Sequence, residues 1–307
     1  MKLFIQIPCY NEEKTLLTTL SALPKNVIGF DEVEVLIIDD GSIDNTVKVA
    51  KDFGVKHFVH FYSNQGLARG FMAGLNYCIK NGADVIINTD ADNQYDANDI
   101  PKLIQPILAK KAELVIGERP IMDIKHFSLF KKILQKLGSA VVRIVSNTMI
   151  IDAPSGFRAI SKNAAKQMNV FNDYTYTLET IIQAGQKRLS VISVPIRTNP
   201  DLRPSRLHTS AYSYIKRSIV TIIRIFVVYK PFAFFMSVAL FLLIIGLGLG
   251  VRFLYFYFIG DGDGHIQSVI LSAILISISF QTGLIAFIAD LQSVNRQLLE
   301  EIKINTY

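Results

Sequence analysis

Cysteine is scarce in this 307-residue sequence, which contains only Cys9 and Cys78. Two cysteines are too few for a disulfide scaffold, and their spacing matches no zinc-binding or redox motif. We therefore expect both to be buried thiols of a cytosolic domain. The hydrophobic fraction is 50%, which excludes a disordered or collagen-like chain. So high a fraction also indicates that the chain is not wholly soluble.

Charged residues are missing from two long stretches near the C-terminal end. Neither 232–251 nor 266–289 contains Asp, Glu, Lys or Arg. A run of about 20 apolar residues is long enough to cross the hydrocarbon core of a bilayer as a helix. A buried helical hairpin of a soluble protein is the alternative, but uncharged stretches of this length are rare in core helices. We expect two transmembrane helices within 231–290.

Basic residues gather on one side of these spans. The segment from Arg203 to Lys230 contains six basic residues and no acidic one, whereas the turn at 260–265 has no Lys or Arg. The positive-inside rule places the basic side in the cytoplasm. No signal peptide is expected at the N-terminus. We predict a multi-pass protein of the cell (inner) membrane whose N-terminal domain and both termini are cytoplasmic.

Two amphipathic segments flank the spans. Residues 211–230 alternate polar and apolar faces, which predicts a juxtamembrane interfacial helix. Residues 291–307 place Leu291, Val294 and Leu298 on one stripe, which predicts a cytoplasmic C-terminal helix. Together with the spans, that helix could form a homo-oligomer with a second copy of the chain, or it could cap its own domain. The sequence leaves both open.

Residues 1 to about 210 have a different pattern. Short apolar runs alternate with helical patterns, as in βα units on a mostly parallel α/β sheet. The predicted strands are 3–7, 33–38, 56–60, 85–88 and 114–116, and the predicted helices are 12–23, 45–53, 67–80 and 98–109. Ligands of such sheets bind beyond the carboxyl ends of the strands. We therefore expect the functional residues in the loops at those ends.

Acidic and amide side chains follow the first two predicted strands. The first strand leads into residues 10–12 (Tyr-Asn-Glu), and the second into residues 39–41 (Asp-Asp-Gly). Carboxylates make a poor phosphate cradle, but they accept hydrogen bonds from a nucleobase and a ribose. A nucleoside is therefore the expected ligand. For either motif alone, helix N-capping by Asn11 or Asp44 is the alternative.

The fourth predicted strand leads into two carboxylates, Asp90 and Asp92, with the amide of Gln94 two residues further on. On a tight turn these oxygens can converge on a hard divalent cation that keeps its other positions for water and phosphate oxygens. Such an ion would neutralise a leaving diphosphate. An EF-hand is excluded, because its Gly and the Glu at its twelfth position are missing. Asp-x-Asp is common in surface turns, and its place at a strand end favours a metal site here.

In this order, the motifs resemble those of the GT-A glycosyltransferases of family 2. Within that family they are most similar to the polyprenyl-phosphate glycosyltransferases, such as dolichyl-phosphate mannose synthase and its bacterial glucosyl relatives. The resemblance covers residues 1 to about 210, and two C-terminal transmembrane helices also occur in that group. The matching segments are 8–12 (PCYNE), 39–42 (DDGS), 64–66 (NQG) with Arg69 and Gly74, 90–94 (DADNQ), 117–119 (GER), Asp152 with 155–158 (SGFR), and Arg203 with 205–207 (SRL).

The resemblance implies a GT-A catalytic domain over 1–210, that is, a Rossmann-like nucleotide-diphospho-sugar transferase fold. It also implies roles for individual residues. The nucleotide would be held by Pro8, Tyr10, Glu12, Ile38, Asp40, Asn64, Arg69, Asp90 and Ala91. Mg²⁺ or Mn²⁺ would be held by Asp90, Asp92 and Gln94. The catalytic residues would be Asp92, Asp152, Arg119, Lys132 and Arg203, of which the last three would face a lipid phosphate.

The partners implied by the resemblance are a UDP- or GDP-linked sugar, a polyprenyl phosphate (undecaprenyl or dolichyl phosphate) and the membrane. No nucleic acid is expected. The charge distribution agrees in sign with a phosphate ligand, because six basic residues between Arg119 and Arg143 accompany one acidic residue, Asp123. Apolar residues recur at helical spacing in the same stretch, which predicts a helix in the membrane interface. Anchoring to the membrane and binding of the phosphate are equally favoured for this helix.

The acceptor determines the chemistry. A phosphate monoester has a second pKa of about 6, so a lipid phosphate is already anionic near pH 7 and needs no strong general base. Positioning and charge neutralisation would then drive the transfer. Glu179 lies roughly where family 2 enzymes with hydroxyl acceptors carry their base, so transfer to a glycolipid or saccharide hydroxyl is the alternative. An ordinary helix-surface or capping role is a further interpretation of Glu179.

Two other functions have less support. A processive polysaccharide synthase would carry a Gln-x-x-Arg-Trp motif, and this sequence has no tryptophan. A catalytically inactive membrane scaffold would not need Asp90 and Asp92. We therefore predict a metal-dependent, inverting hexosyltransferase that makes a polyprenyl-phosphate-linked monosaccharide.

Overall fold

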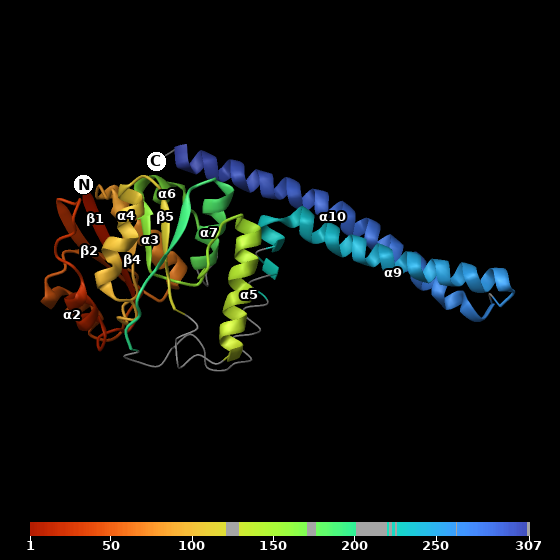
Figure 1. The fold of residues 1–307 in the computed structure, drawn as a ribbon, viewed down its shortest axis with the longest axis horizontal. Coiled ribbons are helices and arrows are strands. Elements are labelled where there is room, and N and C mark those ends of the chain that lie inside the picture. Colours follow the sequence, from red (N-terminus) through yellow and green to blue (C-terminus); the bar gives the residue numbers. More distant parts are fainter. Residues whose placement is uncertain are drawn as a thin grey trace. The chain divides into compact units, whose positions relative to one another are not determined.

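The structure is a computed structural model of the 307-residue chain. It describes residues 1–120, 129–170, 176–200, 220, 223–224, 226–261 and 263–305. The chain divides into two compact units, Met1–Ser218 and Ile219–Tyr307 (Figure 1).

The described part of the first unit contains a seven-stranded sheet. Its strands are β1 (Lys2–Cys9), β2 (Glu32–Asp39), β3 (His57–His60), β4 (Val85–Asn88), β5 (Leu114–Glu118), β6 (Arg158–Ser161) and β7 (Val191–Pro195). The strand order is β3-β2-β1-β4-β6-β5-β7. Only β6 runs antiparallel to its neighbours β4 and β5. The predicted, mostly parallel α/β sheet is confirmed.

The helices of this unit connect the strands. They are α1 (Leu16–Ala22), α2 (Thr46–Phe53), α3 (Leu67–Lys80), the 3₁₀ turn η1 (Ala97–Asp99), α4 (Ile100–Leu108), α5 (Leu129–Ser146), α6 (Lys162–Gln167) and α7 (Thr177–Gln186). The helix expected from residue 12 begins only at Leu16. Residues 12–15 form a turn before it, in which the backbone N–H groups of Thr15 and Leu16 both donate to the Glu12 carbonyl, at 3.1 and 2.9 Å.

The side chains of β1 alternate between two buried faces of the sheet. Leu3 and Ile5 are fully buried in the core that β1 shares with α1 and α4. Gln6 points to the opposite face, where α3 packs. A Cβ on Gly74 would come within 2.4 Å of Gln6 Oε1 and 2.5 Å of Ile38 Cδ1. Only glycine lets α3 approach the sheet this closely, which explains the presence of Gly74 in the motif set.

The second unit contains two long apolar helices, α9 (Pro231–Ile259) and α10 (Ile266–Asn305), with the 3₁₀ turn η2 (Asp263–His265) between them. Both are long and apolar enough to cross a membrane. Their most apolar stretches are only 11% and 17% buried, which is unlike the core helices of a soluble protein. The segment from 291, expected as a separate helix, continues α10 without a break to Asn305.

Small side chains bring α9 and α10 together. Ser272 Oγ donates to the Gly246 carbonyl at 2.6 Å, and Ser279 Oγ donates to the Ala239 carbonyl at 2.7 Å. Both serines are buried. Small residues and hydroxyl groups of this kind are typical of contacts between transmembrane helices. The contacts between the two helices are therefore of a kind that candidate membrane spans use.

Candidate active site

The loops that follow β1 and β2 are joined by hydrogen bonds. Asn11 has a left-handed backbone conformation with φ 56°. Its backbone N–H donates to Ser42 Oγ at 3.0 Å, and its Oδ1 accepts from the backbone N–H of Ile43 at 2.9 Å. The backbone N–H of Glu12 donates to Thr46 Oγ1 at 2.7 Å. The two loops therefore form one continuous surface at the carboxyl ends of adjacent strands.

Four of the predicted nucleotide-binding residues lie on or beside this surface. Pro8 and Ile38 are paired across β1 and β2. Tyr10 is 41% exposed, whereas Glu12 is 7% exposed and its Oε2 accepts from Thr15 Oγ1 at 2.8 Å. An exposed aromatic ring near a sheltered carboxylate can offer a stacking face and a hydrogen-bond acceptor to a nucleoside. The grouping fits the predicted ligand.

Asp40 supports the start of α3 in addition to its predicted binding role. Its Oδ1 accepts from the backbone N–H of Gln65 at 2.6 Å, and its Oδ2 accepts from that of Gly66 at 2.9 Å. Burial nevertheless raises the pKa of Asp40. Asn64 and Arg69 flank these residues and are exposed, and Arg69 Nη1 donates to Gln65 Oε1 at 2.8 Å. The supporting role of Asp40 was not predicted.

Asp90 lies at the base of the turn that follows β4. Its Oδ1 lies 3.0 Å from the position that a Cβ would take on Gly156, and the Tyr95 phenol accepts from the backbone N–H of the same glycine at 2.9 Å. Burial and the negative charge of Asp92 raise the pKa of Asp90. The backbone N–H of Gln94 donates to Asp92 Oδ1 at 3.2 Å. The turn therefore brings both predicted carboxylates together.

This carboxylate pair fits a divalent cation. The raised pKa of Asp90 means that its negative charge is poorly compensated by the protein, and a cation held by both carboxylates would compensate it. No group of three Asp, Glu, His or Cys side chains that could hold a metal occurs among the described residues. The chain would thus offer Asp90, Asp92 and the Gln94 amide. Mg²⁺ and Mn²⁺ suit such a set, because Mg²⁺ takes its other ligands from phosphate and water.

Ala91 lies between the two carboxylates and is also held in place. It is 4% exposed, and its carbonyl accepts from Thr19 Oγ1 of α1 at 2.9 Å. This contact attaches the turn to α1, the helix that follows the loop after β1. The predicted nucleoside and metal groups are therefore parts of one packed region.

Arg119 and Asp152 form a buried ion pair. Arg119 Nε lies 2.7 Å from Asp152 Oδ2 and Nη2 lies 2.9 Å from Oδ1, while the backbone N–H of Arg119 donates to Oδ2 at 3.2 Å. The Asp152 side chain is 0% exposed and that of Arg119 is 8% exposed. A bidentate pair fixes the plane of a guanidinium. The structure thus pairs two of the predicted catalytic residues with each other.

We expect Asp152→Ala to lower the free energy of unfolding by about 3–5 kcal/mol, because it leaves the Arg119 guanidinium buried without its partner. The shift in the urea unfolding midpoint of the detergent-purified protein measures this. The control is Glu32→Ala, which breaks a 3.0 Å pair with Lys2 in which Glu32 is 60% exposed. Exposed pairs contribute at most about 1 kcal/mol. Similar shifts in both variants would contradict a structural role for the buried pair.

Two predicted phosphate-binding groups lie outside the described part of the chain, namely the side chain of Lys132 in α5 and the whole of Arg203. Glu179 is described, in the first turn of α7, and is 8% exposed. Its interpretation as a helix-surface residue is therefore wrong. Burying a carboxylate costs free energy unless its surroundings stabilise it. Glu179 therefore does not serve merely to make the surface of α7 polar.

A buried polar network beneath the carboxylate turn was not predicted. Asn88 Nδ2 donates to the Tyr176 phenol at 2.8 Å and to the Gly156 carbonyl at 2.9 Å, and Asn88 Oδ1 accepts from Gln6 Nε2 at 2.9 Å. Arg158 is 0% exposed, and its guanidinium carbon lies 5.5 Å from the centre of the Tyr176 ring. The sequence feature that could have indicated this network is an amide side chain in each of the mostly apolar strands β1 and β4.

Residues 4–168 match the family model described as glycosyl transferase family 2, which is more than half of the 307 residues. The chain belongs to this family. It is a glycosyltransferase, and the resemblance drawn from its motifs is confirmed.

Its relatives include transferases that act on lipid phosphates. One is the UDP-N-acetylglucosamine–dolichyl-phosphate N-acetylglucosaminyltransferase of Methanococcus voltae, 30% identical over 64% of this chain and 85% of the relative. Another is the undecaprenyl-phosphate mannosyltransferase of Micrococcus luteus, 27% identical over 64% of this chain and 83% of the relative. A third, the polyprenol monophosphomannose synthase of Mycolicibacterium smegmatis, is 25% identical over 66% of this chain and 80% of the relative.

The fold is that of solved GT-A enzymes. Glucosyl-3-phosphoglycerate synthase of Mycobacterium tuberculosis, in complex with Mn²⁺, UDP-glucose and phosphoglyceric acid, superposes with a TM-score of 0.58. The superposition covers 73% of this chain and 79% of that one, at 18% identity. At this identity the likeness shows the fold alone. The GT-A fold expected for the N-terminal part is therefore confirmed.

Proposed function

We propose that this glycosyltransferase moves a sugar from a nucleotide-diphosphate sugar to a polyprenyl phosphate such as undecaprenyl or dolichyl phosphate. The product would be a polyprenyl-phosphate-linked monosaccharide. The observation that carries the proposal is the pair of carboxylates, Asp90 and Asp92, at the end of β4 and beside the loops that follow β1 and β2. The acceptor class is supported by the names of three relatives, each a transferase to a lipid phosphate.

In this proposal the nucleotide lies over the carboxyl ends of β1, β2 and β4. The nucleoside contacts Pro8, Tyr10, Glu12, Ile38 and Asp40, with Asn64, Arg69 and Ala91 at its edges. Asp90, Asp92 and Gln94 hold Mg²⁺ or Mn²⁺, which, when bound, neutralises the charge that develops on the leaving diphosphate. Complexes of a GT-A enzyme with UDP and either Mn²⁺ or Mg²⁺ support this choice of ions.

The reaction then needs positioning more than proton transfer. An anionic oxygen of the lipid phosphate attacks the anomeric carbon, a new C–O bond forms, and the bond to the nucleoside diphosphate breaks, which inverts the anomeric configuration. Arg119, Lys132 and Arg203 hold the acceptor phosphate by charge-assisted hydrogen bonds. Asp152 fixes Arg119 for this role through the bidentate pair.

Transfer to a glycolipid or saccharide hydroxyl is the second candidate. It is favoured by one observation, the burial of Glu179 at 8% exposure in the first turn of α7. In that reaction Glu179 would take the proton of the acceptor hydroxyl. A lipid phosphate would leave Glu179 without a proton to remove.

A labelling panel tests the proposal. Membranes that contain the protein are incubated with radiolabelled UDP- and GDP-sugars and with undecaprenyl or dolichyl phosphate. We expect one lipid to acquire label that mild acid releases as free sugar, and EDTA to prevent the labelling. Label found only on a glycolipid or saccharide would favour the second candidate.

We also propose that the protein spans the cell (inner) membrane through α9 and α10, with the catalytic domain of 1–210, the juxtamembrane helix of 211–230 and both termini in the cytoplasm. Six basic residues and no acidic one between Arg203 and Lys230 support this orientation.

A cysteine introduced at Gly262, which lies outside the described residues, should react with an impermeant thiol reagent added to intact cells. Such a cysteine would lie in the outer turn between the spans. The native Cys9 and Cys78 are both buried, so they should contribute little background, and the unmodified protein is the control. Labelling that requires cell lysis would contradict the proposed orientation.

A further inference from the structure

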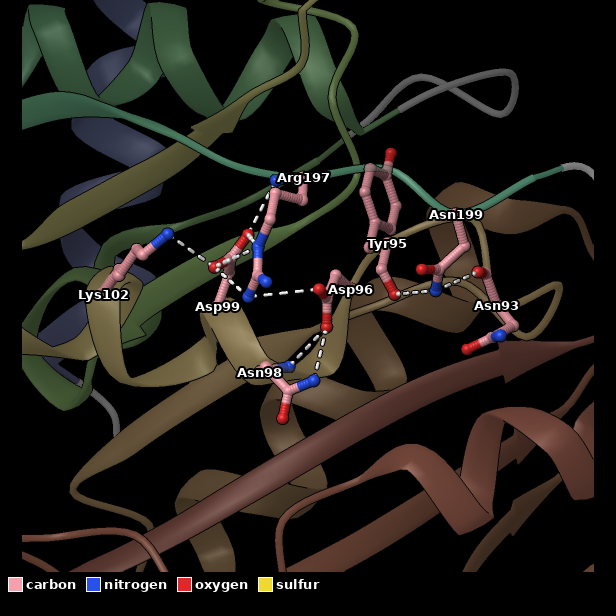
Figure 2. Close-up of polar contacts among 8 residues, drawn as sticks. All are labelled: Asn93, Tyr95, Asp96, Asn98, Asp99, Lys102, Arg197 and Asn199. Atoms are coloured by element: carbon pink, nitrogen blue, oxygen red, sulfur yellow. Dashed lines mark hydrogen bonds and ion pairs between the residues drawn. The ribbon is translucent and has the colours of Figure 1, made fainter.

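The segment that follows β7 crosses the metal-ligand turn, defined here as residues 90–96. Asn199 binds three consecutive carbonyl groups of this turn. Its side-chain Nδ2 donates to the carbonyls of Asn93 and Tyr95 at 3.0 and 3.2 Å, and its backbone N–H donates to that of Gln94 at 2.8 Å. Figure 2 shows the side-chain amide of Asn199 between the backbone carbonyl groups of Asn93 and Tyr95. One residue therefore binds the backbone carbonyls of residues 93–95.

Arg197 fixes the position of this crossing segment. Its backbone N–H donates to Asp99 Oδ2 at 2.6 Å, and its Nη2 lies 2.9 Å from Asp99 Oδ1 and 3.1 Å from Asp96 Oδ2. Lys102 Nζ lies 2.7 Å from Asp99 Oδ1, and the Asp99 side chain is 0% exposed (Figure 2). A buried carboxylate with this many donors holds its partners in one geometry. Asn199 is thereby set in register with the turn.

Tyr95 lies close to Asp90, a candidate metal ligand at the start of the turn. Its phenol accepts from the backbone N–H of Gly156 at 2.9 Å, and Asp90 Oδ1 lies 3.0 Å from the position that a Cβ would take on the same glycine. Its ring stacks on Phe157, with centroids 5.1 Å apart. A phenol has one proton to donate. Since the bond from Gly156 uses an acceptor position, that proton is available for Asp90.

We propose that Asn199 and Tyr95 are positioning residues for the metal and diphosphate site. Asn199 holds the backbone of the turn, including Asn93 in a left-handed conformation at φ 57°, and Tyr95 orients the carboxylate of Asp90. This inference rests on the proposed function, because it assumes that Asp90 and Asp92 bind a divalent cation. Removal of a group that hydrogen-bonds to a metal ligand and orients it typically lowers metal affinity or activity by about 10- to 100-fold.

The test measures binding without turnover. The full chain is purified in detergent, and binding of Mn²⁺ together with UDP, and separately with GDP, is followed by calorimetry. We expect Asn199→Ala and Tyr95→Phe to weaken Mn²⁺-dependent nucleotide binding by about 10- to 100-fold. Asn199→Gln, which keeps an amide donor, should fall between Asn199→Ala and the wild type.

Asn81→Ala is the matched control. Asn81 Nδ2 also donates to a backbone carbonyl, that of Tyr77 at 2.8 Å, but at the far end of α3. Its loss should leave Mn²⁺ affinity within about twofold of the wild type. In activity assays, raising Mn²⁺ should restore most of the turnover of Asn199→Ala, which a general loss of stability would not allow.

Each outcome decides the inference. Equal Mn²⁺ affinity in the wild type, Asn199→Ala and Tyr95→Phe would overturn the positioning role and leave the proposed function intact. A wild type that shows no metal-dependent nucleotide binding would overturn both. If Asn199→Ala fails to fold, Tyr95→Phe carries the test, because it removes a single oxygen and keeps the stacked ring.

Discussion

Asp92→Asn is expected to reduce sugar transfer by at least about 10²-fold, because removal of preorganised charge stabilisation from a transition state costs this much or more. The substitution keeps the size of the side chain and the Oδ1 that accepts from the backbone N–H of Gln94. It also removes the charge that, after burial, contributes most to the raised pKa of Asp90. The variant should therefore keep the fold of the wild type.

Thermal unfolding with and without Mn²⁺ separates loss of metal from loss of fold. The melting temperature of the wild type should rise with Mn²⁺ and nucleotide, and that of Asp92→Asn should not. Asp52→Asn is the matched control, since Asp52 is exposed on α2. Full turnover of Asp92→Asn, or full activity of the wild type in EDTA, would remove the metal from the mechanism.

The sequence was informative wherever the signal was local. The strands β1 to β5 and the helices of 45–53 and 67–80 follow from apolar periodicity, whereas β6 and β7 were not predicted. The two carboxylates of the metal-ligand turn follow from their place after β4. The boundary of α1 was predicted less well, because nothing in the residue types distinguishes the turn before Leu16 from a helix.

Contacts between distant segments could not be predicted in this way. Asn199 binds the Asn93 carbonyl across 106 residues, and Asn88 reaches the Tyr176 phenol across 88. Neither pair has a periodicity or spacing that identifies it. The family resemblance named residues that would touch the substrates, and Asp152, which holds Arg119 in place. It did not name Tyr95 and Asn199, which we propose as positioning residues.

The burial of Glu179 also results from packing between segments that are distant in the sequence. A carboxylate in the first turn of a helix is usually exposed, where it interacts favourably with the helix dipole. In this fold the start of α7 is packed inside the domain, so Thr177 and Glu179 are both 8% exposed. Helical periodicity alone does not reveal which end of a helix is covered. This burial makes Glu179 the residue whose substitution best separates the two acceptor classes.

Glu179→Gln should retain activity on polyprenyl phosphate within about tenfold of the wild type, because an ionised phosphate has no proton to lose. Glutamine matches the buried glutamate in size, so the packing of α7 is kept. Arg203→Ala should raise the Michaelis constant for the lipid and lower turnover, since part of the lost interaction holds the nucleophile in line. Both variants are assayed with the same labelled nucleotide sugar over a range of lipid concentrations.

A hydroxyl acceptor reverses this ranking. Loss of a general base typically costs about 10²- to 10⁴-fold in rate, so Glu179→Gln would then be the damaged enzyme, and Arg203 would matter only for membrane contact. Arg119 is unsuitable for the comparison, because its pair with Asp152 is buried and its removal would also affect folding. A phosphate acceptor needs the positive charge of Arg203 and no general base, whereas a hydroxyl acceptor needs Glu179 as the base. An inactive Glu179→Gln beside an active Arg203→Ala would therefore reject the lipid phosphate as acceptor.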